Sequence, residues 1–165
     1  MILKQLKDSF CISLFVAFFI IVHSSLAQDD NDFESALNSL DSAIEKFLNG
    51  NPDDFINFWS HSDDVTIAGG FGGVIEKGWD SISKRLERVN SVYSKATFET
   101  ERMSLGNDDK FGYIVQHELI KFYGKDENVE MTRNYRITMI FRNEINEWKL
   151  IHRHADANMN WDAPE

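Results

Sequence analysis

Apolar residues recur at helical spacing near the start of the chain. The spacing of Phe33, Leu37, Leu40, Ile44, Phe47 and Leu48 predicts an amphipathic helix over 33–48. Asn31 with Glu34 forms a capping pair that fits the start of this helix, and Gly50 fits its end. We expect a short second helix from Asn51, which buries Phe55, Phe58 and Trp59. We expect a third helix after Gly78, with Ile82, Leu86 and Val89 on one face.

The pattern then changes to alternating apolar and polar residues separated by turn residues. Long strands are predicted over 96–105, 111–123, 129–142 and 147–156, after two short ones over 65–68 and 74–75. The glycine-rich segment 69–73 matches no phosphate-binding motif, so tight backbone turning explains it better. The order of elements predicts an α+β domain with helices against one face of a curved sheet.

The last two strands carry the most distinctive side chains. Because side chains alternate faces along a strand, one face of the last strand should hold Trp148, Leu150, His152, His154 and Asp156. The other face should hold Lys149, Ile151 and Arg153. The preceding strand divides into an apolar face and a face with Arg136 and Thr138. This pairing would bring a guanidinium, a hydroxyl, two imidazoles and a carboxylate together in a small pocket.

The first 27 residues have the features of a secretory signal peptide. Lys4 and Lys7 precede an uncharged apolar run over 10–22, and Ser25-Leu26-Ala27 matches the small-x-small cleavage pattern. We therefore expect a signal peptide over 1–27, a single domain over 28–165, and a secreted or periplasmic protein. An uncleaved N-terminal anchor is the alternative, although the run is shorter than the ~20 residues of a membrane span.

Charge and cysteine content narrow the possible partners. The chain of 165 residues has a formal net charge of -10, which disfavours binding to nucleic acid or to an anionic membrane surface. Its single cysteine, Cys11, lies in the predicted signal peptide, so neither a disulfide scaffold nor a thiol nucleophile is expected. We expect no nucleic-acid partner, no membrane contact after signal cleavage, and no cofactor.

Several motifs resemble the nuclear transport factor 2-like superfamily, and within it the SnoaL-like group. They are Gly72-Gly73, Gly78-Trp79, Arg136-x-Thr138, Phe141-Arg142 and Trp148 followed by His152-x-His154, within a match over about 33–158. The resemblance implies a cone-shaped (cystatin-like) α+β fold, with three N-terminal helices packed on a curved antiparallel sheet around a cavity. It also implies a homodimer. The superfamily includes isomerases, cyclases, hydrolases, dehydratases and binding modules, so the fold does not fix the function.

Candidate site residues follow from the pocket expected at this sheet. The candidates for ligand binding are Trp59, His61, Tyr113, Arg136, Thr138, His152 and His154. The candidates for acid–base catalysis are Asp64, Glu118, His154 and Asp156. The alternatives are structural: Trp59 in the core, Asp64 in a turn, and Glu118 in an ion pair with Arg136 or Lys121. Arg136 is as well explained by an ion pair with Glu118 or Glu130 as by a ligand.

The two histidines of His152-x-His154 fall short of a metal site. A closed site needs a third ligand, and nothing in the sequence fixes which of the candidates Asp156, His117 and His61 would supply it, so no metal is predicted. Three functions remain open. The first is binding of a small, largely apolar molecule that bears a carbonyl or carboxylate. The others are an acid–base enzyme of isomerase, cyclase or hydrolase type, and a dimeric interaction module whose pocket is vestigial.

Overall fold

The computed structural model describes residues 29–70, 74–123 and 130–157. The chain divides into two units, 1–32 and 33–165, and the second unit holds the sheet and its helices. The predicted signal peptide and the turn predicted over 124–128 lie outside the described residues. None of the described helices is long and apolar enough to cross a membrane.

Three helices lie close to where the sequence predicts them. They are α2 (Asp29–Leu48), α3 (Asp53–Phe58) and α4 (Trp79–Asn90). Helix α2 already begins at Asp29, so the prediction that Asn31 caps its start was wrong. Gly50 follows the helix with a φ of 88°, a left-handed conformation that glycine adopts without steric cost.

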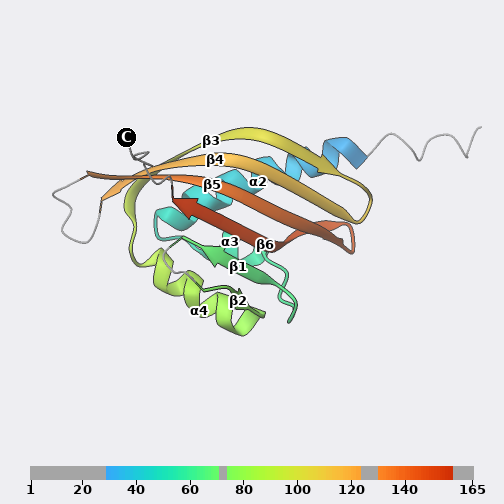
Figure 1. Cartoon of the computed structure of the whole chain (residues 1–165), viewed down its shortest axis with the longest axis horizontal. Helices are drawn as coiled ribbons and strands as arrows, with labels where there is room; N and C mark the ends of the chain where they lie inside the picture. The colour runs from blue at the N-terminus through green and yellow to red at the C-terminus, as the bar shows by residue number, and fades with distance from the viewer. Residues whose placement is uncertain (1–28, 71–73, 124–129, 158–165) are drawn as a thin grey trace, which may run out of the picture. The chain divides into compact units, whose positions relative to one another are not determined.

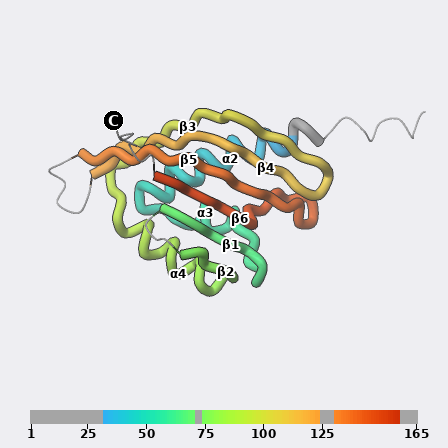
Figure 2. The backbone as a smooth tube through the Cα atoms, in the orientation of Figure 1, coloured from blue at the N-terminus to red at the C-terminus, as the bar shows by residue number. Residues whose placement is uncertain are grey.

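Six strands form one curved sheet beside these helices (Figure 1). Their bounds are β1 (Thr66–Gly69), β2 (Glu76–Lys77), β3 (Ser94–Asn107), β4 (Phe111–Tyr123), β5 (Glu130–Glu144) and β6 (Glu147–Ala157). The order across the sheet is β2-β1-β6-β5-β4-β3, and β1 and β6 pair in parallel while the other neighbouring strands within the described residues are antiparallel. The tube trace shows that β6 lies between β1 and β5, although β1 precedes it by many residues (Figure 2). The predicted α+β fold class is confirmed.

The core lies between helix α2 and one face of the sheet, called here the inner face. The Phe33 ring of α2 contacts Phe141 of β5 and Trp148 of β6, with ring centroids 5.4 and 4.7 Å apart. Gly112 of β4 allows this approach, because a Cβ there would lie 2.6 Å from the Phe33 ring. The helix therefore packs close to β4 at this point, and its apolar stripe is buried.

A β-bulge in β6 reverses the alternation that the sequence predicts. Phe141 pairs with Leu150, but its neighbour Ile140 pairs with His152, so Ile151 is an extra residue. Before the bulge the even-numbered Trp148 and Leu150 are buried in the core. After it, inward-facing residues are odd-numbered, namely Arg153 and Ala155. The prediction that Trp148, Leu150, His152, His154 and Asp156 share one face was therefore wrong.

The hairpin between β5 and β6 contains a conformational strain. Ile145 and Asn146 form its turn with φ values of 54° and 64°, both left-handed. Two-residue hairpin turns of this kind favour Asn or Gly at both positions, whereas a β-branched residue is strained there. The Ile145 side chain is 97% exposed, so packing does not offset this strain.

Replacing Ile145 with Asn should therefore stabilise the fold. We expect Ile145→Asn to raise the free energy of unfolding by roughly 0.5–1 kcal/mol, since the left-handed region costs most L-residues about 1–2 kcal/mol. Urea denaturation of the variant and the wild type measures this difference. The matched control is Ile145→Val, which keeps the β-branch and should leave the stability close to that of the wild type.

Candidate functional site

A cavity lies on the inner face, between the sheet and the three helices. Its volume is about 70 Å³, several times the ~10–15 Å³ that a single water molecule needs. Most of its lining is apolar and comes from α2, α3, α4 and strands β1, β4, β5 and β6. The lining residues are Ile44, Phe47, Leu48, Phe55, Ile67, Ala68, Gly69, Gly70, Arg85, Leu86, Val89, Tyr93, Glu118, Ile120, Tyr135, Arg153 and Ala155.

A buried ion pair forms the polar wall of this cavity. The Glu118 side chain of β4 is fully buried, and its Oε2 accepts a hydrogen bond of 2.6 Å from Arg153 Nη2 of β6. Its Oε1 accepts a second hydrogen bond, of 3.0 Å, from the buried amide of Gln116. Arg153 Nε is buried and has no hydrogen-bond partner among the described residues. Both oxygens of the Glu118 carboxylate therefore accept hydrogen bonds, while the Arg153 guanidinium still has one N–H donor without an acceptor among the described residues.

Two tyrosine hydroxyls lie near this ion pair. Tyr93, which follows α4, and Tyr135 of β5 are both buried and hydrogen-bond to each other through their side chains. Burial raises the pKa of Tyr93, so its hydroxyl stays protonated at neutral pH. A protonated hydroxyl can donate to an oxygen atom in the cavity.

Arg85 of α4 is the second arginine in the cavity wall. Its guanidinium donates to the carbonyl oxygen of Gly69 and lies 3.4 Å from the carboxylate of Glu76. The side chain is only 7% exposed, and these two partners satisfy part of its donor capacity. Arg85 therefore links helix α4 to the end of strand β1.

A second ion pair lies behind Glu118, between α2 and the sheet. Asp41 of α2 accepts a 2.6 Å hydrogen bond from Arg102 of β3, which pairs directly with Gln116 of β4. Burial raises the pKa of Asp41, Arg102 opposes this, and the negative charge of Glu118 adds to the rise. Two carboxylates therefore lie near each other, each compensated by its own arginine.

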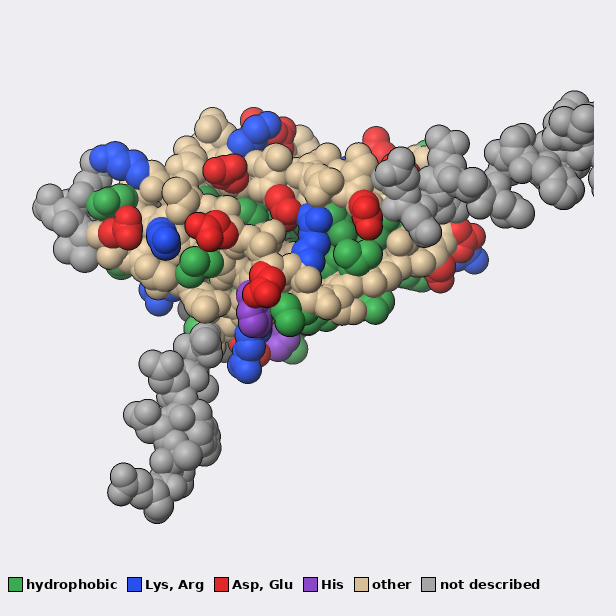
Figure 3. Space-filling view, turned by 90° about the horizontal axis from the view of Figure 1, so that it is seen from above, with side chains coloured by type: hydrophobic (Ala, Val, Ile, Leu, Met, Phe, Trp, Pro, Cys, Tyr) green, Lys and Arg blue, Asp and Glu red, His purple; other side chains and the backbone are tan. Residues whose placement is uncertain are grey.

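The side chains expected to form the pocket do come together, but on the outer face of the sheet. Arg136 lies 3.6 Å from Asp156, and His154 lies 3.1 Å from the same carboxylate. Thr138 pairs with His154 across the two strands. The β-bulge turns this cluster away from the cavity, and Figure 3 shows histidine side chains beside acidic and basic ones at the surface.

Interactions within the outer face also involve His152. Its Nδ1 lies 2.7 Å from the hydroxyl of Thr66 in β1. Partial burial and the neighbouring His154 lower the pKa of His152, so it is neutral at neutral pH. The structure shows no group of three or more His, Cys, Asp or Glu placed to hold a metal ion within 29–70, 74–123 and 130–157.

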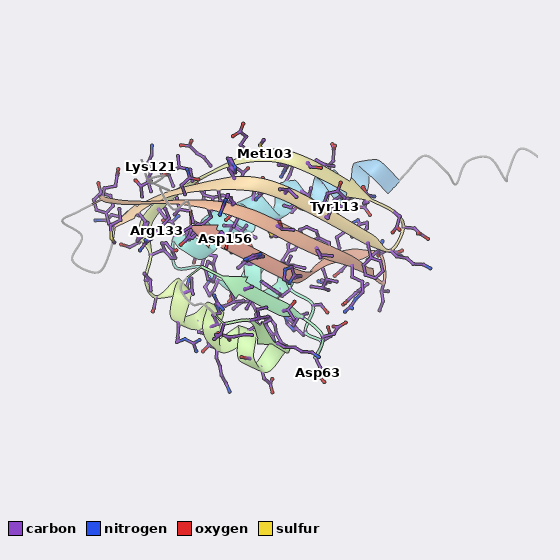
Figure 4. All side chains as sticks on the ribbon, in the orientation of Figure 1. Asp63, Met103, Tyr113, Lys121, Arg133 and Asp156 are labelled. Carbon is purple, nitrogen blue, oxygen red and sulfur yellow. The ribbon has the colours of Figure 1, made fainter. Side chains whose placement is uncertain are left out.

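The remaining predicted residues are scattered. Trp59 is buried in the core, and His61 stacks on Trp79 with ring centroids 3.9 Å apart. Tyr113 is 44% exposed near the start of β4 and lies apart from Asp156 along the sheet (Figure 4). Of the catalytic candidates, only Glu118 lines the cavity, and its partner is Arg153 rather than Arg136 or Lys121.

Asp64 forms a surface ion pair that ties the 60–64 segment to β5. Its carboxylate lies 2.7 Å from Arg142 Nη1, and Arg142 also bonds Glu144. The hydrogen bond from Arg142 lowers the pKa of Asp64 to about 2. A carboxylate of such low basicity, 61% exposed, is suited to fixing a turn rather than to accepting a proton from a substrate.

Sequence reasoning missed Arg153, Arg85, Tyr93 and Tyr135 as cavity residues. Strict alternation places Arg153 on the face opposite to Trp148 and Leu150, because it does not allow for the bulge at Ile151. Tyr135 lies on the predicted apolar face of β5. The sequence does not indicate that its hydroxyl meets that of Tyr93 in a cavity. The signal that could have revealed the bulge is the pattern Leu150-Ile151 followed by Ala155, in which the apolar positions change from even to odd.

The fold and the cavity define a small α+β domain with an internal, mostly apolar chamber. The chain belongs to the SnoaL-like domain family, whose model matches residues 37–157. No curated protein sequence matches the chain.

Solved structures share this fold at low sequence identity. A ketosteroid isomerase-like protein from Erwinia carotovora atroseptica is 12% identical, with a TM-score of 0.67 over 81% of this chain and 99% of that one. A nuclear transport factor 2-like superfamily protein from Salmonella enterica is 14% identical, with a TM-score of 0.67 over 82% and 94%. A hexachlorocyclohexane dehydrochlorinase of type 2 is 14% identical, with a TM-score of 0.64 over 79% and 90%. At these identities the likeness shows the fold alone.

The Asp64–Arg142 ion pair predicts a stability difference that depends on pH. Because the folded pKa of Asp64 is depressed to about 2, its contribution is full above about pH 4 and is lost as pH falls towards 2. Asp64→Asn should therefore lower the free energy of unfolding at neutral pH by only about 0.2–1 kcal/mol, as expected for an exposed pair.

Urea denaturation across this pH range measures the effect. The difference between wild type and Asp64→Asn should shrink as pH falls, whereas the control Asp63→Asn, which changes the adjacent carboxylate, should show no such trend. A difference that stays constant down to the lowest pH would contradict this role of the Arg142 contact.

Proposed function

We propose that this protein binds a small, largely apolar molecule in the inner-face cavity, through a carbonyl or carboxylate group of that molecule. The apolar lining would bury the body of the ligand. Arg153, with the tyrosine hydroxyls nearby, would donate hydrogen bonds to its oxygen. The observation that carries this proposal is Arg153, which lines the cavity and whose buried Nε has no hydrogen-bond partner among the described residues.

Burying a donor without a partner is unfavourable, so a site that contains one is suited to an acceptor from a ligand. The cavity has one polar wall and otherwise aliphatic and aromatic lining, which is the usual composition of a small-molecule site. These two features support binding independently of any reaction.

An acid–base enzyme is the second candidate, and Glu118 is the observation that favours it. It is a carboxylate in the cavity wall, and the similar structures include an isomerase-like protein and a dehydrochlorinase. Both of its oxygens, however, already accept hydrogen bonds, from Arg153 and from Gln116. A substrate proton would have to compete with these two donors for the carboxylate oxygens, so binding is the function that the geometry supports better.

We also propose export and homodimer formation. The N-terminal 27 residues have the pattern of a signal peptide. The outer face carries exposed apolar side chains that lie together, since Tyr113 pairs with Ile140 and Val115 pairs with Thr138. Tyr113, Ile140 and Val115 are each more than a third exposed, and a patch of this kind is suited to contact with a second copy.

Native mass spectrometry of the protein purified from its own host tests the binding proposal. We expect a retained small organic molecule on the wild type. The double variant Glu118→Gln/Arg153→Met should lose it, because both charges of the polar wall disappear together. Changing both residues avoids leaving one buried charge unpaired, which would destabilise the fold. The control Glu101→Gln/Arg136→Met removes the same charges from the outer face and should retain the molecule.

Equal retention by the two double variants would show that the polar wall does not hold the ligand. A wild type that carries nothing, and that binds no member of a series of small ketones and carboxylates, would overturn the binding proposal.

The mass of the intact assembly tests the other two proposals. We expect a dimer of chains that begin at Gln28, and we expect Val115→Glu to give monomers, because it buries a charge at the contact. The control Ile145→Asn removes an exposed apolar side chain from the hairpin and should leave the dimer intact. A wild type that is monomeric, or that retains residues 1–27, would contradict dimer formation or cleavage respectively.

A further inference from the structure

We infer that the cavity selects an uncharged carbonyl compound and discriminates against the carboxylate of the same size and shape. This inference rests on the proposed function and narrows it, because that function leaves the carbonyl and the carboxylate open. It follows from the partners that the charged groups of the cavity already have.

The positive charge of Arg153 is neutralised within the protein. Its Nη2 lies 2.6 Å from Glu118 Oε2, and the Glu118 side chain is fully buried. A ligand carboxylate that approached Arg153 would also approach this fixed carboxylate. Like charges at close range in a poorly solvated site repel strongly. The ion pair therefore offers an incoming anion little net attraction.

Arg85, which also lines the cavity, has its own partners within the protein. The guanidinium of Arg85 lies 3.4 Å from Glu76 and also donates to the carbonyl oxygen of Gly69. Behind Glu118, Asp41 brings a further carboxylate, and it is matched by Arg102 at 2.6 Å. Arg153 and Arg102 each have a carboxylate partner, whereas Arg85 shares Glu76 with Arg88, which lies 3.8 Å from the same oxygen. Beside Arg153, therefore, the cost of desolvating a ligand anion would not be offset.

A neutral hydrogen-bond acceptor avoids both the repulsion and the large desolvation cost that a carboxylate meets in the cavity. Arg153 Nε is a buried donor without a partner among the described residues, and the paired hydroxyls of Tyr93 and Tyr135 lie in the same cavity. A ketone or amide oxygen loses much less hydration than a carboxylate on entering an apolar site. It would satisfy the Arg153 donor without confronting Glu118 with a second negative charge.

Acetophenone and benzoate test this selection, because both have the same aromatic ring and the same number of non-hydrogen atoms. We expect the wild-type protein to bind acetophenone at least about tenfold more tightly than benzoate in NMR titrations at neutral pH, a difference of about 1.4 kcal/mol. Benzamide, which is also neutral, should behave like acetophenone. Benzoate binding as tightly as acetophenone would overturn the inference while leaving the proposed binding function standing. Binding of none of the three probes would count against the proposed function itself.

Glu118→Gln supplies the reverse test. It removes the internal carboxylate and leaves the guanidinium of Arg153 unpaired, so a ligand carboxylate can take its place. We expect benzoate to bind Glu118→Gln at least about tenfold more tightly than it binds the wild type, and to raise the melting temperature of the variant. Acetophenone should show no comparable gain. The control Glu101→Gln removes a carboxylate of the same charge from the outer face, and it should leave the preference for acetophenone unchanged.

Two outcomes of this second test would overturn the inference. One is no gain in benzoate affinity or melting temperature for Glu118→Gln. The other is an equal gain for Glu101→Gln, which would trace the effect to net charge rather than to the ion pair. The wild-type comparison stands without any variant, so it decides the question even where Glu118→Gln folds poorly.

Discussion

The β-bulge at Ile151 is the local feature on which the chemistry of this protein depends. Without it, the histidines of β6 would face the core and Arg153 would face solvent. With it, the same strand provides apolar side chains to the core before the bulge and a guanidinium to the cavity after it. Bulges often redirect side chains beside functional sites, and here the redirected residue is the only partner that Glu118 has for a full ion pair among the described residues.

The buried Glu118–Arg153 pair is energetically demanding. Removing two charges from water costs several kcal/mol per ion, and the mutual attraction offsets this only with good geometry and additional hydrogen bonds. Gln116 supplies one of these bonds to Glu118, and the short distance to Arg153 supplies the geometry. An apolar pair would fill the same space without this cost. The retention of charge in an otherwise apolar chamber fits a role in recognition better than a role in stability.

The rest of the fold holds this chamber in place. Helix α2 packs against the inner face through Phe33 and the close approach at Gly112, while α4 is fastened to β1 through Arg85. The outer face carries the histidines, Arg136 and Asp156 in mutual contacts, together with apolar side chains. The two faces therefore differ in chemistry: the inner one is suited to a small molecule, and the outer one to a macromolecular surface.

The sequence by itself determined the helices, the strands and the α+β class, because these depend on local periodicity and turn residues. The sequence also predicted that Arg136, Thr138, His154 and Asp156 would meet, but the hairpin register alone does not bring them together. The hairpin pairs Phe141 with Leu150, and only the extra residue Ile151 places Arg136 opposite Asp156 and Thr138 opposite His154. Only the tertiary structure decided which face they occupy. A single inserted residue at Ile151 exchanges the two faces of a strand. The change of apolar positions from even to odd is its trace in the sequence, but the pairing with β5 fixes where the extra residue lies. The convergence of Glu118, Arg153, Tyr93 and Tyr135 was likewise decided by tertiary structure, because these residues come from distant segments that meet only when the sheet curves around the cavity.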